Sequence, residues 1–240
     1  MKSLYVGIVA IAVTLSGLMA QAQTADDIIS KHIDALGGKE KIAAIKTVYT
    51  EYDLEIMGTT APGVSYMING KGYRNELDLA GQKMIQCVTD KGGWMINPMM
   101  GQTSPEPLPE DQVKAGQTQF QAGGTLYDYA AKGYKVELLG TESINGADAH
   151  KLKLTVPDVS ETVYLIDPNT YHIVKATVKS LAPSAGGMET VMTFSNFKKS
   201  EFGYVIPGTT EITMPQVSMV INVNKIEINK EIDPKLFEME

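Results

Sequence analysis

The chain has 240 residues, a formal net charge of −7 and one cysteine, Cys87. The excess of acidic residues disfavours nucleic acids and anionic lipid headgroups as main partners, because both attract basic surfaces. One cysteine excludes an intramolecular disulfide, and Cys87 lies in an apolar, strand-like run, where a buried, inert thiol is favoured over a nucleophile. The length suits a single domain with a sizeable core.

The first 22 residues have the pattern of a secretory signal peptide. Lys2 supplies a positive charge, residues 4–18 are almost entirely apolar or small, and Ala20-Gln21-Ala22 offers the small-x-small pattern that signal peptidase reads. A transmembrane anchor is disfavoured, because the apolar run is shorter than the roughly 20 residues that span a bilayer. The pattern predicts export to the periplasm and cleavage near Ala22. Since no cysteine stands at the cleavage point, we expect no lipid anchor.

Helical signals follow the signal peptide directly. Thr24 and Asp27 have the spacing of a capping box, and apolar residues then recur at helical spacing up to Leu36. The pair Gly37-Gly38 marks the end of this helix. A second short helix is expected over residues 39–44.

From Thr47 onward the apolar period changes to two, which is typical of half-buried strands. Further segments of this kind follow, with turn residues between them. They are residues 64–69, 73–79, 83–89, 93–96, 134–139, 150–156, 162–166, 171–179, 191–197, 209–214 and 217–228. We predict a mainly β protein with helices (α+β), in which a single domain over 23–240 forms an antiparallel sandwich, barrel or strongly curved sheet.

The strand rhythm is interrupted near residues 99–132, in a segment rich in Gly, Pro and Gln. Pro109 followed by Glu110 and Asp111 is typical of a helix start, and residues 126–131 are expected to form another short helix. We interpret this segment as a helical insertion, or lid, within the one domain.

The sequence shows no arrangement typical of a catalytic or metal centre. Its histidines, His32, His150 and His172, have no metal-binding spacing. There is no Cys/His cluster for zinc, no nucleophile elbow and no phosphate-binding glycine loop. Ordinary packing or surface histidines are favoured, and we predict a protein that is not an enzyme and uses no metal or cofactor.

Carboxylates leave one enzymatic alternative open. Glu51, Asp53 and Glu55 alternate along the first strand, and Glu76 and Asp78 along another. Paired carboxylates can cleave glycosides as acid and base, and a row of acids can bind calcium weakly. Alternating acids on a strand more often mark its solvent face, so a carboxylate-dependent hydrolase is the weaker alternative.

Methionines and aromatic residues give the most suggestive pattern. Met95, Met99 and Met100 flank the sole tryptophan, Trp94, where a strand gives way to the Gly/Pro-rich segment. Methionine is flexible and polarizable, so it suits surfaces that accept varied apolar ligands. The candidate wall of an apolar cavity comprises Trp94, Met95, Met99, Met100, Met67 and Tyr66. Plain core filling beneath a loop is the alternative interpretation.

Several short motifs occur in a fixed order along the chain. They are HIDALGG (32–38), IAAIKT (42–47), GGWMINPMMG (92–101), GTESING (140–146), YLID (164–167), GYVIP (203–207) and IDPKLF (232–237). Over nearly the whole mature chain this order resembles the LolA/LolB-like, outer-membrane lipoprotein-sorting family of Bacteroidetes-type bacteria. The resemblance implies an unclosed antiparallel β-barrel of about eleven strands, capped by short helices around an apolar cavity that holds lipids or the acyl chains of lipoproteins. The only arginine, Arg74, lies on a predicted strand, and its role stays open.

Two functions from different classes follow from these patterns. The first is a monomeric, non-catalytic periplasmic carrier whose partner is a lipid or an acylated lipoprotein, together with possible outer-membrane or envelope proteins and no nucleic acid. The alternative is an interaction or sensor module that docks the same curved sheet on another envelope protein. A hollow, apolar inner face would favour the carrier, and a filled interior with an exposed apolar patch would favour the module.

Overall fold

The computed structural model describes residues 23–144 and 146–239. The predicted signal peptide, residues 1–22, lies outside these ranges. Within them, no helix combines the length and the apolar composition that crossing a membrane requires.

The described chain begins with two helices, α1 (Ala25–Ala35) and α2 (Lys39–Ala43). The predicted capping box is confirmed: the Asp27 backbone N–H donates to the Thr24 hydroxyl at 3.2 Å, and the Thr24 N–H donates to the Asp27 carboxylate at 3.0 Å. Gly37 follows α1 with a φ of +125°. A Cβ at this position would lie 2.7 Å from the carbonyl oxygen of Gly203, so both the backbone angle and the close approach require glycine.

Thirteen strands form one antiparallel sheet, which confirms the predicted mainly β fold. They are β1 (Thr47–Ile56), β2 (Thr59–Ile68), β3 (Gly72–Leu79), β4 (Gln82–Thr89), β5 (Gly93–Ile96), β6 (Glu106–Pro107), β7 (Lys135–Ile144), β8 (Ala147–Val156), β9 (Ser160–Ile166), β10 (Ile173–Ser180), β11 (Glu189–Ser195), β14 (Thr209–Met214) and β15 (Val217–Ile228). In space their order is β6-β5-β4-β3-β2-β1-β15-β14-β11-β10-β9-β8-β7. The sheet is not closed, because within the described ranges β6 and β7 each pair on one side only. Two short strands, β12 (Lys198–Lys199) and β13 (Val205–Ile206), form a separate pair.

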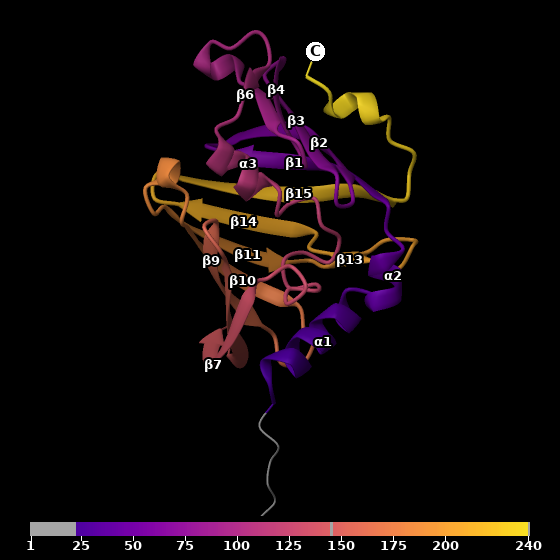
Figure 1. Ribbon diagram of the computed structural model, residues 1–240, viewed down its shortest axis with the longest axis vertical. Coiled ribbons are helices and arrows are strands. Elements are labelled where there is room, and N and C mark those ends of the chain that lie inside the picture. Colours follow the sequence, from indigo (N-terminus) through magenta and orange to yellow (C-terminus); the bar gives the residue numbers. More distant parts are fainter. Residues whose placement is uncertain (1–22, 145, 240) are drawn as a thin grey trace, which may run out of the picture.

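The main core lies on the inner face of this sheet, which curves around α1, α2 and the segment 117–134 (Figure 1). Met67 of β2 lies opposite Val48 of β1 and Tyr73 of β3, so these three side chains share that face. The buried residues of the main core include Ile28, Ile33, Ile42, Met67, Val88, Phe120, Leu126, Leu152, Leu154, Val156 and Ile166. Full burial of such a side chain contributes roughly 1.5–3 kcal/mol, so this cluster is the principal source of stability.

A second, smaller core lies on the outer face, under the C-terminal segment. Its short helix η3 (Pro234–Phe237) packs on β3 and β4. Phe237 and Ile232 form a buried cluster with Cys87 and Trp94. Gly72 makes room for this contact, because a Cβ there would lie 2.9 Å from the Phe237 ring.

The segment between β5 and β7 is only partly helical. It contains η1 (Pro98–Met100), β6 and α3 (Glu110–Gly116), so the helix start expected at Pro109 is confirmed. The helix expected over 126–131 is wrong, because these residues form turns. Asp128 has a φ of +49°, which the right-handed helical path does not allow.

Candidate functional site

Four adjacent strands, β1, β15, β14 and β11, turn a row of apolar side chains toward the inner face. Met192 of β11 lies opposite Ile212 of β14. Ile212 lies opposite Met219 of β15, which in turn lies opposite Ile56 of β1. We call the following set the inner apolar strip: Ile56, Met192, Phe194, Ile212, Met214, Met219 and Ile221.

The register places the inner apolar strip on the same face as the main core. Leu152 lies opposite Tyr164, which lies opposite Ala176, and Ala176 lies opposite Met192. Directly opposed residues of neighbouring strands share a face. Leu152 is fully buried, whereas every member of the strip is half-buried. The helices and the segment 117–134 therefore cover one part of the inner face and leave another part accessible.

The strip has the chemistry of a surface for apolar ligands. Three of its members, Met192, Met214 and Met219, are methionines, whose flexible thioethers adapt to ligands of different shape. A small buried cluster that includes Leu54 and Leu77 continues the apolar surface beyond Met219. Such a surface can hold an acyl chain by burial alone, without covalent chemistry.

Helix α3 reaches from β4, on one side of the inner apolar strip, to the loop between β10 and β11 on the other side. At one end Gly116 packs on Val88 of β4, and a Cβ there would lie 2.7 Å from the valine side chain. At the other end the backbone N–H of Ser184 donates to the Asp111 carboxylate at 3.0 Å. Ser184 belongs to η2 (Pro183–Ala185), between β10 and β11. Because β1, β15 and β14 lie between β4 and β11 in the sheet, α3 crosses the strands that carry the strip.

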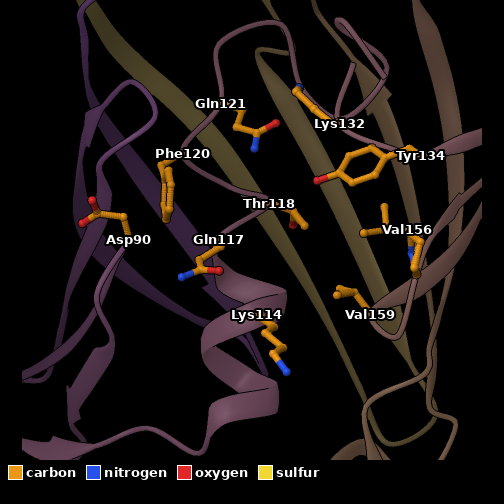
Figure 2. Close-up of a pocket in the computed structure, with 11 residues that line it drawn as sticks. Asp90, Lys114, Gln117, Thr118, Phe120, Gln121, Lys132, Tyr134, Val156 and Val159 are labelled. Atoms are coloured by element: carbon orange, nitrogen blue, oxygen red, sulfur yellow. The ribbon is translucent and has the colours of Figure 1, made fainter. Parts of the chain in front are cut away.

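A cavity of about 470 Å³ lies beside the C-terminal end of α3 (Figure 2). The residues around it include Asp90, Lys114, Phe120, Gln121, Lys132 and Val159. Burial lowers the pKa of the Lys132 ammonium, and the Gln121 Oε1 is buried without a hydrogen-bond partner within the described residues. This cavity therefore has the chemistry to receive a polar group, in contrast to the apolar strip.

The predicted cavity wall divides between the two faces of the sheet. Met67 and Met95 point to the inner face and pack in or against the main core. Tyr66 and Trp94 point to the outer face, where they pack with the C-terminal segment. Successive residues of a strand point to opposite faces, so neither Tyr66-Met67 nor Trp94-Met95 can line one cavity together.

The other two predicted wall residues, Met99 and Met100, are exposed on η1. The strip itself was missed by sequence reasoning. Its signal is present in the alternation of Ile212, Met214 and Met219 with Thr, Glu and Ser, but similar alternation runs through most strands of the chain.

The side chain of Arg74 fastens the C-terminal segment to the outer face. Its Nη1 donates to the carbonyl oxygen of Leu236 at 2.5 Å, and its guanidinium lies 5.2 Å from the ring centre of Trp94. The Trp94 Nε1 donates to the carbonyl oxygen of Phe237 at 3.3 Å. Glu76 holds the guanidinium in place through an ion pair of 2.8 Å.

Cys87 lies in the same outer cluster and is fully buried, as predicted. Burial raises the pKa of its thiol to about 11, so the thiol stays protonated at neutral pH.

The three histidines gather around Tyr171, in the turn between β9 and β10. The His32 Nδ1 lies 2.8 Å from the Tyr171 carbonyl oxygen, and the His150 ring stacks on the Tyr171 ring at a centroid distance of 5.9 Å. His172 is the next residue, and its ring stacks on Phe197. Burial lowers the pKa of His32 to about 4, so its imidazole is neutral. Within residues 23–144 and 146–239, no three His, Cys, Asp or Glu side chains are arranged to hold a metal ion.

The carboxylates of β1 and β3 lie on the outer face. A shallow cavity of about 280 Å³ on that face is lined in part by Glu51, Asp53, Glu76, Asp78 and Lys83. Glu76 pairs with Lys83 at 3.6 Å as well as with Arg74. The Asp53 carboxylate accepts a hydrogen bond from Asn224 at 2.9 Å. This arrangement matches the solvent face that the alternation predicts.

Solved structures share this architecture. A domain described as an outer membrane lipoprotein-sorting protein, from Vibrio parahaemolyticus, superposes with a TM-score of 0.58 at 16% sequence identity, covering 88% of this chain and 94% of that chain. A LolA superfamily protein from Nitrosomonas europaea superposes with a TM-score of 0.58 at 15% identity, covering 90% and 97%. The fold is therefore LolA-like. A DUF1329 family protein from Desulfovibrio piger has the same LolA-like fold, with a TM-score of 0.60 at 14% identity and a coverage of 90% and 98%.

Sequence comparison adds no closer relative: no protein-family model matches the chain, and no curated protein matches it. At these identities the structural likeness establishes the fold alone. It confirms the unclosed, LolA-like architecture that the sequence motifs implied.

Proposed function

We propose that this protein is a periplasmic carrier for an apolar ligand, namely a lipid or the acyl chain of a lipoprotein. The observation that carries the proposal is the inner apolar strip, a half-buried row of Met, Ile and Phe side chains on the inner face of a LolA-like sheet. Native proteins seldom leave such a row half-covered without a partner for it. The description of the Vibrio domain as a lipoprotein-sorting protein supports the same class of ligand.

Binding by this strip requires only burial. Each methylene group of an acyl chain that leaves water contributes about 0.8 kcal/mol, which offsets the cost of ordering the chain. Met67 and Met95 would border the ligand where the strip meets the main core, and Met99 and Met100 would stand at the entrance. Trp94 and Tyr66 take no part, because they hold the C-terminal segment on the other face. The segment 99–132 with α3 would act as the lid, and no metal, cofactor or catalytic step is needed.

The route to the compartment rests on residues 1–22, which we propose to be a signal peptide cleaved near Ala22. Export would deliver the carrier to the space between two membranes, where an apolar ligand needs a protein to cross water. A carrier with one strip would bind as a monomer.

Ligand binding is tested with the exported protein and two matched variants. The double substitution Ile212→Gln with Met219→Gln places one amide on β14 and one on β15, both within the strip. The control Val220→Gln places one amide on the outer face of β15. We expect the strip variant to bind a fluorescent fatty acid about tenfold more weakly and the control to bind as the wild type does. Native mass spectrometry of the wild type should show copurified lipid. Equal affinity in all three proteins, or no lipid and no probe binding by the wild type, would contradict the proposal.

A further inference from the structure

One end of the sheet carries six of the connections between consecutive strands. Ile56 lies opposite Met219 and Met214 lies opposite Val217, so the turn after β1 and the turn after β14 are neighbours. The same register brings the connections after β3, β5, β8 and β10 to this end. We call these connections together the turn end: residues 57–58, 80–81, 97–105, 157–159, 181–188 and 215–216. Figure 1 shows the turns after β1, β10 and β14 at its left edge.

The turn end is nearly free of charge. Its residues are all described by the structure, and Asp158 is the one charged residue among them, although 20% of the chain is Asp, Glu, Lys or Arg. The connections at the opposite end include Lys71, Asp90, Lys91 and Asp167. Protein surfaces normally carry many charged residues. The low number of charged residues at the turn end therefore indicates that this surface meets a partner other than water.

Apolar side chains project from these uncharged connections. Met57 is 90% exposed, Met99 75%, Met100 72%, Met188 43% and Leu181 41%. They stand on three separate connections, after β1, β5 and β10. Exposure of these side chains to water is unfavourable, and contact between the turn end and an apolar partner would relieve it.

The inner apolar strip runs out to this same end. Ile56 directly precedes the exposed Met57, and Met214 directly precedes the turn at 215–216. An apolar ligand that leaves the strip at the turn end therefore meets apolar side chains rather than charges.

We propose that the turn end docks on the surface of a lipid bilayer, with its methionine side chains inserted at the level of the headgroups. Isolated apolar tips penetrate a bilayer one by one, whereas a protein partner needs a continuous complementary surface. A near-absence of charge lowers the cost of approaching the hydrocarbon. The charged side chains that border the turn end are of both signs: Lys179 lies opposite Glu189 and Lys83 opposite Asp78. Three carboxylates also bond turn-end residues, since Asp78 accepts from Gly81, Glu106 from Gln102 and Asp111 from Ser184. No basic cluster therefore selects anionic lipids. This proposal extends the proposed function by naming the membrane as the source or destination of the ligand.

The test is flotation of the exported protein with phosphatidylcholine vesicles. The test variant combines Met57→Gln, Met99→Gln, Met100→Gln and Met188→Gln, which are uncharged changes of similar size at exposed positions. The control is Met239→Gln, since Met239 is 51% exposed but lies outside the turn end. We expect the wild type and the control to float with the vesicles and the fourfold variant to lose at least about tenfold in vesicle affinity. Adding anionic lipid should not raise the wild-type affinity, because the protein carries a net negative charge.

Binding of a soluble fluorescent fatty acid without vesicles separates this proposal from the proposed function. The double variant Met57→Gln with Met188→Gln leaves Met99 and Met100, at the proposed ligand entrance, unchanged. It should bind the probe as the wild type does and still lose part of its vesicle affinity. One outcome separates the two proposals: the wild type binds no probe, but it floats with vesicles and the fourfold variant does not. This result would contradict the carrier function and support membrane docking. Flotation that is the same for the variant and the wild type, flotation that needs anionic lipid, or a wild type that stays with the vesicle-free fraction would overturn the docking, and the last result would leave the turn end to a protein partner.

Discussion

The two faces of the sheet treat their apolar surfaces differently. On the outer face, Cys87 and Trp94 are sealed by residues of the same chain, among them Ile232 and Phe237. On the inner face, α1, α2 and the segment 117–134 seal the main core but leave the strip around Met192 half-covered. A surface that the chain covers itself contributes to stability, and one that it leaves open is available to a ligand. The comparison predicts that substitutions on the outer surface lower the free energy of unfolding, whereas substitutions on the strip lower the affinity for an apolar ligand.

The largest effect is expected at the covered outer surface. Trp94→Ala removes the ring under Phe237 together with its hydrogen bond, so the free energy of unfolding should fall by about 3–5 kcal/mol. Urea unfolding measures this change, and Trp94→Phe should lose less. The folded fraction of the variant should bind the fatty-acid probe as the wild type does. A loss of probe affinity in the folded protein would mean that the two surfaces are coupled.

The free energy of unfolding should depend on pH through His32, a buried residue of α1. Its pKa of about 4 in the folded state lies below the ordinary value of 6.5, so the unfolded chain binds a proton first as the pH falls. The stability from this group is therefore complete above pH 6.5 and is lost as the pH falls toward 4, by roughly 3 kcal/mol. Urea unfolding at pH 7 and pH 4 measures the loss, and in His32→Gln it should be smaller by that amount. Equal losses in both proteins would show that His32 titrates normally.

The smallest effect on stability is expected at the strip. Met192→Gln changes a side chain that is half-buried, so the free energy of unfolding should change by less than about 1 kcal/mol while affinity for the probe falls. Met67→Gln is the matched control, because Met67 is buried in the main core and should lose about 2–4 kcal/mol. Equal costs at both positions would place Met192 in a filled core and remove the distinction between the surfaces.

Local patterns predicted most of the fold, because they follow from contacts a few residues apart. The capping box at Thr24, the stop at Gly37 and the alternation from Thr47 each determine the backbone nearby, and each has its counterpart in the structure. The turns at 126–131 were missed, because apolar spacing there resembles a helix while Asp128 adopts a left-handed conformation that the sequence does not announce.

The candidate site was less predictable, because it depends on contacts far apart in the chain. Trp94, Met95, Met99 and Met100 are neighbours in the sequence. Successive residues of a strand point to opposite faces, however, so Trp94 and Met95 lie on different sides of the sheet. Nothing near Trp94 or Arg74 indicates that residues more than 140 positions later will cover them. The strip likewise arises only when β1 pairs with β15, the two strands that join the N-terminal and C-terminal parts of the sheet.

The unpaired edges of the sheet have a mechanical consequence. In the part of the chain that the structure describes, no ladder of backbone hydrogen bonds joins the two-residue β6 to the ten-residue β7. Leu108, which follows β6, and Val136 of β7 instead belong to the same apolar core. The distance between the two edge strands can change while the backbone hydrogen bonds between all other strands stay intact. In the proposed carrier, the width of the inner face can therefore adjust to the size of the ligand at the cost of a few side-chain contacts.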